Sequence, residues 1–559
     1  MKINGAQIVI ETLIKNSVDV VFGYPGGAVL NIYDELYKNA DRIHHVIAAH
    51  EQGAAHAADG YARASGKVGA VIATSGPGAT NLVTGIATAY LDSVPLVAIT
   101  GNVATPLLGK DSFQEVDIVG ITMPITKHNY IVRDVSELEA IIDEAFLIAK
   151  SGRPGPVLID IPKDVQAQEY EYSGEKPKQP EPFLQADKDS IAGAAAMIAA
   201  SEKPYIYCGG GVISSGASAE LMTLAQKLDA PIGTSMMGLS AVRSSYERNL
   251  GMVGMHGKYA SSKAKSEADL VIAVGTRFSD RATGDKAAYT SKAKFIHIDI
   301  DPAEVDKNIT ADIALIGDIR ATLQKLNAMI EQSKGNADWH SEVDRYMQIQ
   351  RRYDTDSDAI TAKNVIETVR QFCDDDTIVA TDVGQHQIWV AQHYRFERPR
   401  THLTSGGLGT MGFGMGAAIG GCFASGSSDG KLKKTILFTG DGSFGMNLNE
   451  LATAVSQNLP LVVVIMNNGV LGMVRQWQKA FYDGRYASTT LNRKTDFVKL
   501  AEAFGANGYR ATDMHELQDA VKSAFEAEGP AVIDCVIDMD DRVLPMIPPG
   551  GSIKDIILE

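Results

Sequence analysis

TILFTGDGSFGMNLNELATAVSQNLPLVVVIMNN, residues 435–468, joins two apolar, β-branched runs through a helix-like segment. A glycine turn, Gly440-Asp441-Gly442, follows the first run, and Asn467-Asn468 ends the second. This order predicts two parallel strands joined by a helix, which brings the carboxyl ends of both strands to one sheet edge. There Asp441 and the amide oxygen of Asn468 can meet one Mg²⁺, while the glycines let backbone N–H groups approach a diphosphate. On its own, the pattern is equally compatible with a glycine turn and an asparagine cap.

A second stretch repeats this pattern near the start of the chain. TSGPGATNLVTGIATAYLDSVPLVAITGN, residues 74–102, and residues 439–467 both run Thr, Gly-x-Gly, Asn-Leu, Ala-Thr-Ala, Pro-Leu-Val and Asn over a 28-residue step. Chance agreement between apolar sequences accounts for part of this likeness. A duplicated fold explains more of it, so we predict that the first and last parts of the chain share one architecture.

Two polar stretches divide the chain. Residues 169–187 are rich in charge and proline and residues 335–358 are highly charged, so both are predicted linkers, the second with room for a surface helix. Within the remaining regions, short β-branched runs alternate with helix-like stretches, which predicts three α/β domains with mainly parallel sheets. The predicted domains and the C-terminal tail are residues 1–168, 188–334, 360–545 and 546–559.

The composition excludes several classes of protein. With 559 residues, 45% hydrophobic and 21% charged, the chain has the make-up of a globular protein of several domains. Its net charge of -16 disfavours nucleic acid or an anionic membrane as the partner. The four cysteines form no C-x-x-C pair, which is typical of reduced, intracellular thiols. The start lacks signal-peptide features, and glycine and proline interrupt the apolar residues 69–101, so we expect a cytoplasmic protein without a membrane span.

The Gly-Asp-Gly turn, a gap in the mid-twenties and the Asn-Asn pair together resemble the signature of thiamine-diphosphate enzymes. The resemblance implies that residues 1–168 and 360–545 are pyrimidine-binding and diphosphate-binding domains of common fold, in accord with the internal repeat. Further strings are similar to the biosynthetic catalytic subunit of acetohydroxyacid synthase, also called acetolactate synthase. They are FQEVDIVGIT from Phe113, SGRPGPVLIDIPKDV from Ser151, GMHG from Gly254, GTRFSDRATG from Gly275, HIDIDPAEV from His297, GMVRQWQ from Gly472 and LPMIPPGG from Leu544.

This resemblance implies a set of cofactor-binding residues. Asp441, Asn468 and the backbone carbonyl of Val470 are the implied Mg²⁺ ligands. Glu51 is implied to hold a proton near the aminopyrimidine ring, so that the cofactor acts as its own base. Without the family, Glu51 would be interpreted as a helix N-terminal residue favoured by the helix dipole. The other residues implied to contact thiamine diphosphate are Tyr24, Pro25, Pro77, Asn81, Val383, Gly384, Gln385, His386, Gly409, Met411, Gly442 and Ser443.

In the same family the middle domain binds FAD, which implies a Rossmann-like domain over residues 188–334. A Rossmann-like spacer without flavin is the alternative, because Gly209-Gly210-Gly211 is not a complete dinucleotide fingerprint. Ser279 stands where the family has an acid, so one flavin contact is in doubt. The residues implied to contact FAD are Arg153, Gly209, Gly210, His256, Gly257, Arg277, Asp280, Asp299 and Ile300.

The implied reaction is a carboligation that starts the biosynthesis of valine, leucine and isoleucine. Pyruvate loses CO₂, and the remaining hydroxyethyl carbanion adds to pyruvate, giving 2-acetolactate, or to 2-ketobutyrate, giving 2-aceto-2-hydroxybutyrate. Arg281 is implied to bind the acceptor carboxylate. Trp477 is implied to favour the larger ethyl group, a preference of about 1–3 kcal/mol. The other residues implied at the substrates are Gly27, Phe113, Gln114 and Lys163.

The family also implies partners. Its cofactor-binding domains meet between subunits, so we expect a homodimer or a dimer of dimers, together with a small regulatory subunit. An FAD-dependent pyruvate oxidase, a flavin-free catabolic acetolactate synthase and a non-catalytic scaffold homologue are the alternatives. Trp477 and the FQE and RFSDR strings favour the synthase, and Glu51 with Asp441 argues against a scaffold. Met415-Gly416 replaces a common Leu-Pro of the family, and we expect this change only to relax the start of a helix.

Overall fold

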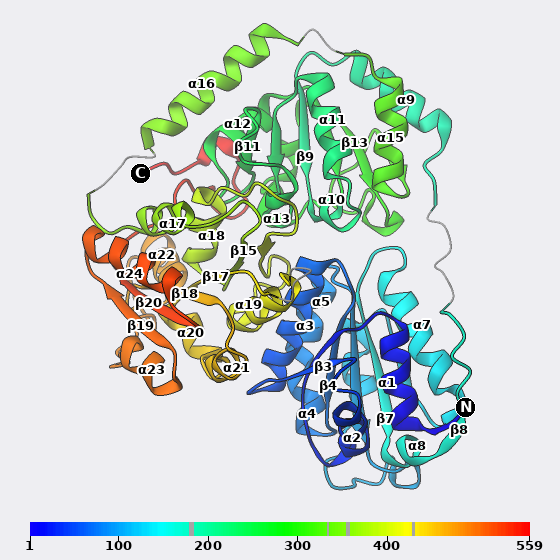
Figure 1. Cartoon of the computed structure of the whole chain (residues 1–559). Coiled ribbons are helices and arrows are strands. Elements are labelled where there is room, and N and C mark those ends of the chain that lie inside the picture. The colour runs from blue at the N-terminus through cyan, green and yellow to red at the C-terminus, as the bar shows by residue number, and fades with distance from the viewer. Residues whose placement is uncertain (178–183, 333–334, 354–357, 427–430) are drawn as a thin grey trace.

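The computed structural model describes residues 1–177, 184–332, 335–353, 358–426 and 431–559. Three six-stranded sheets with flanking helices dominate the architecture (Figure 1). Every strand pairing inside these sheets is parallel. The predicted fold class, three α/β domains with mainly parallel sheets, is therefore confirmed. We call the three units the first, middle and third modules, in chain order.

The first module has the strand order β3-β2-β4-β5-β7-β6. Its sheet strands are β2 (Val20–Tyr24), β3 (His44–Ile47), β4 (Gly69–Ala73), β5 (Leu96–Asn102), β6 (His128–Ile131) and β7 (Pro156–Pro162). Its helices are α1 (Gly5–Lys15), α2 (Leu30–Lys38), α3 (Glu51–Ser65), α4 (Pro77–Asn81), α5 (Val83–Leu91), α6 (Ile118–Thr122), α7 (Leu138–Lys150) and α8 (Lys163–Ala167). The chain order reverses between β2 and β4, and such a switch point at the carboxyl ends of the strands is where doubly wound sheets bind ligands.

The third module has the equivalent order, β16-β15-β17-β18-β20-β19. Its strands are β15 (Ile378–Thr381), β16 (His402–Leu403), β17 (Thr435–Gly440), β18 (Leu461–Asn467), β19 (Asn507–Ala511) and β20 (Ala531–Val536). Its helices are α17 (Ala362–Gln371), α18 (Gln385–His393), α19 (Phe413–Ala424), α20 (Asp441–Asn447), α21 (Glu450–Ser456), α22 (Gly472–Phe481), α23 (Phe497–Phe504) and α24 (Met514–Glu526). Numbered within each module, both sheets read 2-1-3-4-6-5. The predicted common fold of the first and third modules is confirmed, and the two repeated stretches lead to the fourth strand in both.

The middle module has the order β11-β10-β9-β12-β13-β14, which is 3-2-1-4-5-6 within the module. Its strands are β9 (Pro204–Cys208), β10 (Ile232–Thr234), β11 (Asn249–Met252), β12 (Leu270–Val274), β13 (Lys294–Asp299) and β14 (Ile313–Ile316). Its helices are α9 (Lys188–Ala199), α10 (Gly210–Ser214), α11 (Ser218–Leu228), α12 (Tyr259–Glu267), α13 (Asp280–Thr283), α14 (Lys286–Thr290), α15 (Ile319–Met329) and α16 (Ala337–Tyr353). This is the strand order of a Rossmann fold, with its switch point between β9 and β12. The Rossmann-like middle domain is confirmed.

The two predicted linkers are partly structured. Residues 335–358 form α16 over most of their length, so the surface-helix alternative holds for Ala337–Tyr353. Trp339, Val343 and Tyr346 are buried at helical spacing on one face of α16, and the Trp339 indole N–H donates to the Pro204 carbonyl at 3.2 Å. In the first linker, β8 (Glu169–Glu171) pairs antiparallel with β1 (Lys2–Asn4). Residues 178–183 and 354–357 of the predicted linkers lie outside the described residues.

The first and third modules meet through α3 and α19, which cross closely in Figure 1. Glycines make this approach feasible: a Cβ atom at Gly60 of α3 would lie 2.3 Å from the Ala417 carbonyl oxygen. On α19, a Cβ atom at Gly416 would lie 2.6 Å from the Gly53 carbonyl oxygen. Met415 and Gly416 lie in the first turn of α19, so their expected effect on a helix start stays a prediction, and Gly416 also permits the close contact with α3.

The C-terminal tail folds back onto the middle module, where the red end of the chain lies beside α12 in Figure 1. Met546 and Ile557 form an antiparallel bridge within the tail. The backbone N–H of Ile547 donates to the Met255 carbonyl at 2.7 Å, and that of Asp285 donates to the Gly551 carbonyl at 3.0 Å. The tail thus covers the loop that precedes α12 and the turn that follows α13.

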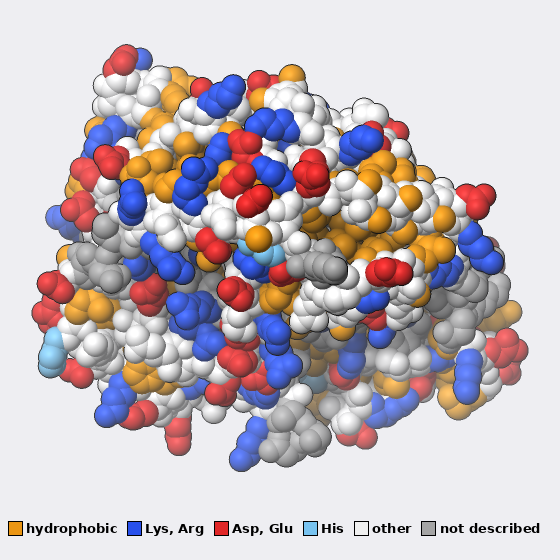
Figure 2. Space-filling view, turned by 90° about the horizontal axis from the view of Figure 1, so that it is seen from above, with side chains coloured by type: hydrophobic (Ala, Val, Ile, Leu, Met, Phe, Trp, Pro, Cys, Tyr) orange, Lys and Arg blue, Asp and Glu red, His pale blue; other side chains and the backbone are white. Residues whose placement is uncertain are grey.

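The surface carries both signs of charge. Figure 2 shows Lys and Arg side chains interspersed with Asp and Glu over the face in view, with hydrophobic side chains between them. Within the described residues, no helix combines the length and the apolar character needed to cross a bilayer.

Candidate functional site

The third module gathers predicted cofactor residues at the carboxyl ends of β15, β17 and β18. Asp441 opens α20 directly after β17 and is only 7% exposed. Asn468 follows β18, and its side-chain N–H₂ donates to the Gln385 amide oxygen at 3.3 Å. The Asn468 amide oxygen accepts the backbone N–H of Val470 at 3.2 Å. The structure therefore brings Gln385, Asp441, Asn468 and Val470 together at the switch point of the third sheet, as the strand-helix-strand reading of the sequence expected.

The electrostatics of this cluster fit a cation. Burial, against the lowering effect of the backbone N–H groups of Gly442 and Gly469 and with a small contribution from the Asp534 carboxylate, raises the pKa of Asp441 to about 6. A buried carboxylate without a basic partner gains most from a metal ion. The described residues contain no group of three or more His, Cys, Asp or Glu that could hold a metal. One carboxylate with an amide and a backbone carbonyl suits Mg²⁺, which takes its remaining oxygens from phosphate and water.

The same edge offers donors to an anion. His386 lies against Gly440, where a Cβ atom would come 3.0 Å from the His386 Nδ1 atom. The His386 Nε2 atom is buried and has no hydrogen-bond partner. Burial lowers the pKa of His386 to about 3, so the ring is neutral at physiological pH. The unpartnered nitrogen next to the glycine turn, with no side chain at Gly440 or Gly442, fits a bound diphosphate.

Asp382 joins the two loops that carry these residues. Its carboxylate accepts the backbone N–H of Val383 at 2.8 Å and that of Gly412 at 2.7 Å. It thereby sets the distance between the loop that leads into α18 and the loop of Gly409 and Met411. Burial raises the pKa of Asp382 to about 6, while these backbone bonds lower it. The predicted contact residue Ser443 is 2% exposed, and its hydroxyl accepts the Gly440 N–H at 3.2 Å, so it shapes the turn.

In the first module, a second cluster lies at the equivalent switch point between β2 and β4. The Asn81 side-chain N–H₂ donates to the Glu51 carboxylate at 2.9 Å. A Cβ atom at Gly78 would lie 3.2 Å from the same carboxylate. The structure thus brings Glu51, Asn81 and the turn that begins α4 at Pro77 together.

The other predicted residues of the first module surround this cluster. Tyr24 ends β2 and Pro25 follows it, and the open side of Gly27 faces free space, with no atom within 4 Å of a Cβ built there. Gln114 has φ 58° and packs its backbone against the Gly76 turn, where a Cβ atom would meet its carbonyl oxygen at 2.8 Å. Phe113 is 87% exposed, and Lys163 opens α8 on the surface.

The predicted acceptor residues come together from different modules. The Arg281 guanidinium of the middle module lies 5.6 Å from the ring centroid of Trp477 in the third module. The Arg281 side chain is 62% exposed, and its only described ion pair is a long one, 3.9 Å to Asp280. The Trp477 indole nitrogen is buried without a hydrogen-bond partner. An accessible cation beside an apolar ring with an unpartnered donor suits a small keto acid, because the cation binds its carboxylate and the ring contacts its alkyl group.

The predicted flavin residues of the middle module gather at its switch point. A Cβ atom at Gly209, after β9, would lie 2.0 Å from the Gly275 carbonyl oxygen after β12, so these turns touch. Asp299 ends β13, and Gly210, Arg277 and Ile300 follow strand ends of the same edge. His256 and Gly257 follow β11, and the buried His256 Nδ1 atom has no partner. Asp280 is 84% exposed at the side chain, and Ser279 caps α13 with no side-chain hydrogen bond.

Arg153 reaches this edge from the first module. Its guanidinium is 2.6 Å from the Glu304 carboxylate and 3.4 Å from that of Asp301, and its Nε donates to the Ser93 hydroxyl at 2.8 Å. Arg153 therefore ties the first module to the middle module in addition to any contact with a nucleotide.

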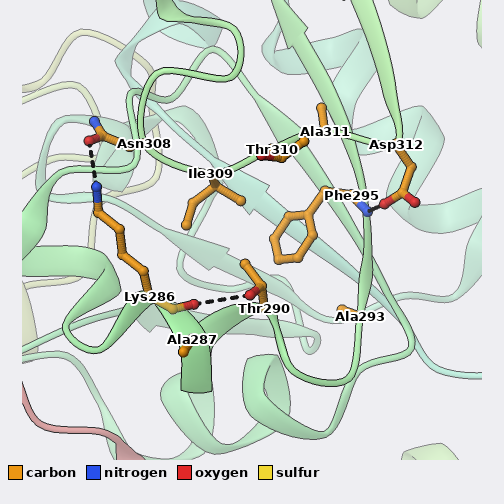
Figure 3. Close-up of a pocket in the computed structure, with 10 residues that line it drawn as sticks. All are labelled: Lys286, Ala287, Thr290, Ala293, Phe295, Asn308, Ile309, Thr310, Ala311 and Asp312. Atoms are coloured by element: carbon orange, nitrogen blue, oxygen red, sulfur yellow. Dashed lines mark hydrogen bonds between the residues drawn. The ribbon is translucent and has the colours of Figure 1, made fainter.

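A separate cavity of about 450 Å³ lies in the middle module (Figure 3). It is lined by residues at the amino ends of β13 and β14, including Phe295 and Asp312, and by Lys286 of α14. Lys286 donates to the Asn308 amide oxygen at 3.0 Å, and Asp312 accepts the Phe295 N–H at 2.7 Å. This cavity is at the opposite sheet edge from the glycine turns, and Asn308 of its lining is linked to the predicted flavin residues by donating to the Arg277 carbonyl at 3.2 Å.

Comparison with known proteins assigns the three modules. Models of the thiamine pyrophosphate enzyme N-terminal TPP binding domain, central domain and C-terminal TPP binding domain match residues 3–121, 191–326 and 382–535. The acetolactate synthase isozyme 3 large subunit of Escherichia coli (strain K12) is 42% identical over 571 residues, which cover 100% of this chain and 98% of that protein. The chain belongs to the acetolactate synthase large-subunit family of thiamine pyrophosphate enzymes.

Two further members of the acetolactate synthase family support the assignment. The large subunit of Parasynechococcus marenigrum (strain WH8102) is 45% identical, with 98% of this chain and 90% of that protein covered. The large subunit of Haemophilus influenzae (strain ATCC 51907 / DSM 11121 / KW20 / Rd) is 41% identical, with 100% and 98% covered. The predicted resemblance is confirmed, and with it the reaction class: acetolactate synthase catalyses the carboligation step of branched-chain amino-acid biosynthesis. The pyruvate oxidase and scaffold alternatives are set aside.

Two buried carboxylates of this acetolactate synthase family member were not predicted as site residues. Asp382 directly precedes the predicted Val383, and Glu450 of α21 accepts backbone N–H groups next to Glu51. Only their position beside predicted residues, or inside the repeated stretch, could have drawn attention to them. Their roles depend on backbone groups that are distant in the sequence.

Proposed function

We propose that this chain decarboxylates pyruvate and joins the remaining two-carbon unit to a second 2-keto acid, either pyruvate or 2-ketobutyrate. The family assignment supports the carboligation. The observation that carries the choice of substrates is the Arg281 guanidinium 5.6 Å from the Trp477 ring, because this pair combines a carboxylate-binding cation with an apolar surface.

Thiamine diphosphate and Mg²⁺ are the proposed cofactors, and the two clusters fit them. Asp441, the Asn468 amide oxygen and the Val470 carbonyl would hold the metal. His386 and the backbone N–H groups of the turn at Gly442 would hold the diphosphate. When bound, thiamine diphosphate supplies a nucleophilic carbon and an electron sink for the decarboxylation.

Glu51 is the proposed proton carrier of the site. A carboxyl group is required because the aminopyrimidine must be protonated at one ring nitrogen to act as a base. The Asn81 amide, 2.9 Å away, orients the Glu51 carboxyl group. Gly78 lets the turn of α4 approach the Glu51 carboxyl group closely, because a Cβ atom there would lie 3.2 Å from it.

Arg281 and Trp477 are proposed to select the acceptor. The guanidinium binds the carboxylate of the incoming 2-keto acid, and the indole edge contacts its alkyl group. One methylene of extra contact favours 2-ketobutyrate over pyruvate by about 1–3 kcal/mol. Gly27, Phe113, Gln114 and Lys163 complete the proposed substrate environment.

The middle module is proposed to hold FAD at the turns of Gly209 and Gly275. The unpartnered His256 Nδ1 atom and the Arg277 guanidinium are the donors that an anionic nucleotide would use there. The carboligation has no net redox change, so the flavin is proposed to be structural.

The assembly and location are also proposed. The family name large subunit implies a small subunit as partner. We further propose a homodimer or a dimer of dimers in the cytoplasm, with each site formed between subunits. Within one chain, no described hydrogen bond or ion pair joins Glu51 to the Asp441 cluster, which is consistent with each facing a second copy.

An omission assay tests the proposed function. Purified protein is given pyruvate and 2-ketobutyrate together, and thiamine diphosphate, Mg²⁺ and FAD are left out in turn. We expect both acetohydroxy acids in the complete mixture and none without thiamine diphosphate or Mg²⁺. Acetyl phosphate or H₂O₂ as the main product would instead establish an oxidase. Full activity of a colourless protein would show that FAD is not a cofactor.

A further inference from the structure

Glu450 is a buried carboxylate that the proposed function does not use. It opens α21 of the third module, is 1% exposed and contacts the segment just before α3 of the first module. One carboxylate oxygen accepts the His50 N–H at 2.9 Å, and the other accepts the Ala49 N–H at 3.1 Å. The Thr453 hydroxyl donates to the latter oxygen at 2.7 Å.

The first turn of α3 is shaped to admit this side chain. A Cβ atom at Gly53 would lie 2.1 Å from a carboxylate oxygen of Glu450, so only glycine leaves room for it. A carboxylate at this place also stabilises α3, because the N-terminus of a helix carries partial positive charge. Burial raises the pKa of Glu450, while Thr453 and the two backbone N–H groups lower it.

Glu51 is the first residue of α3 and follows His50 directly. Its backbone position is therefore determined by the peptide groups that Glu450 holds, and its side chain by Asn81. Contacts of α3 with α19 hold the middle of the helix at Gly60. Among the described side chains, Glu450 is the one from another module that hydrogen-bonds the backbone of Ala49 and His50.

We propose that Glu450 is a positioning residue for Glu51: it holds the peptide groups of Ala49 and His50 so that the Glu51 carboxyl group is aimed at the cofactor ring. This inference rests on the proposed function of Glu51. The third module then contributes to catalysis in two ways. Asp441, at the start of α20, would bind Mg²⁺, and Glu450, just after the end of α20, orients Glu51.

The proposal predicts a defect in proton transfer at the cofactor rather than in substrate binding. In Glu450→Gln, an amide replaces one acceptor oxygen, so a backbone N–H of Ala49 or His50 faces another donor and the segment must shift. A misplacement of about 1 Å can cost about 100-fold in rate. We therefore expect kcat to fall while KM for pyruvate changes little.

The test measures exchange of the C2 proton of bound thiamine diphosphate for deuterium, by NMR after rapid quenching, in protein saturated with cofactor and Mg²⁺. We expect Glu450→Gln to slow this exchange by about tenfold or more. Thr453→Val is the matched control, because it removes a donor to Glu450 but keeps the bonds to Ala49 and His50, and its exchange should stay within about twofold of the unmodified protein.

A second variant keeps the carboxylate. Gly53→Ala should displace Glu450 and slow the exchange in the same way, so the proposal remains testable even if Glu450→Gln does not fold. Its control is Gly85→Ala, which crowds α3 from α5 at Ala55, with a Cβ contact of 2.3 Å, and does not touch Glu450.

Glu51→Gln in the same experiment separates the two claims. If Glu51→Gln leaves the exchange unchanged, the proposed function of Glu51 is wrong. If Glu51→Gln abolishes the exchange but Glu450→Gln and Gly53→Ala do not slow it, the positioning role of Glu450 is wrong. Equal losses in Thr453→Val and Gly85→Ala would also overturn it, because they would indicate a general effect on α3.

Discussion

The first and third modules have one strand order but opposite chemistry at the same switch point. In the third module, the turn after β17 carries Asp441, buried and 7% exposed, with His386 beside it. In the first module, the turn after β4 carries no acid, and the carboxyl group of Glu51 arrives instead from the start of α3. The same fold thus carries the proposed metal and diphosphate site in the third module and the proposed proton carrier in the first. The two modules differ in proposed function because of the side chains at this sheet edge, since their strand order is the same.

Glu51→Gln should cause the largest loss. The amide keeps the size and the contact with Asn81 but cannot carry the proton, so acetolactate formation should fall by about 100- to 10,000-fold. The measurement is the initial rate from pyruvate at saturating cofactor and Mg²⁺. Glu137→Gln, at an exposed position of the same module, is the control. A rate within a few-fold of that of the unmodified protein would show that Glu51 is not the proton carrier.

Asp441→Asn should weaken Mg²⁺ binding at the third module. The change removes the only carboxylate of the proposed Mg²⁺ site, so about 100-fold more Mg²⁺ should be needed for half-maximal activity, with partial recovery at high Mg²⁺. A Mg²⁺ titration of the rate measures this. Asp519→Asn, exposed on α24, is the control. An unchanged titration curve would contradict the metal assignment.

Arg281→Gln should affect the acceptor and leave both cofactor clusters intact. Loss of one charged hydrogen-bond pair, about 1.5–3 kcal/mol, should raise KM for the acceptor keto acid about 10- to 100-fold. The activation constants for thiamine diphosphate and Mg²⁺ should not change. Arg345→Gln on α16 is the control. If the cofactor constants shift instead, Arg281 belongs to the cofactor site.

Trp477→Leu should give the smallest effect, a change in preference. Removing the indole edge should lower the selectivity for 2-ketobutyrate over pyruvate by about tenfold. Competition between the two keto acids in one mixture measures the ratio directly. Phe481→Leu is the matched control, since its ring packs against Trp477 with centroids 5.6 Å apart but lies one turn further along α22. Equal shifts in both variants would assign the preference to the helix as a whole.

The sequence predicts most of the frame and much of the site. The spacing of Asp441 and Asn468 and the internal repeat predict two equivalent sheets, and the family resemblance adds Glu51, Arg281 and Trp477. The prediction for residues 335–358 allowed a surface helix but not its buried face, although the helical spacing of Trp339, Val343 and Tyr346 was readable from the sequence. The roles of Asp382 and Glu450 were not readable, because each depends on backbone N–H groups brought close only by tertiary packing.

Contacts between modules escape prediction for the same reason. Gly416 was expected only to relax a helix start, but its lack of a side chain also lets α19 approach Gly53 and His56 of α3. A local pattern indicates where a helix begins, but the closeness of two helices depends on side chains of both.

Subunit mixing tests most directly whether the two modules serve opposite ends of one cofactor in a site between chains. Glu51→Gln and Asp441→Asn proteins, each nearly inactive, are mixed under conditions of subunit exchange and assayed for acetolactate. A mixed dimer has one site with both changes and one with neither. Random exchange makes about half of the dimers mixed, so we expect about a quarter of the unmodified activity. No recovery, with exchange verified by tagged subunits, would contradict the account, because every site would then lie within a single chain.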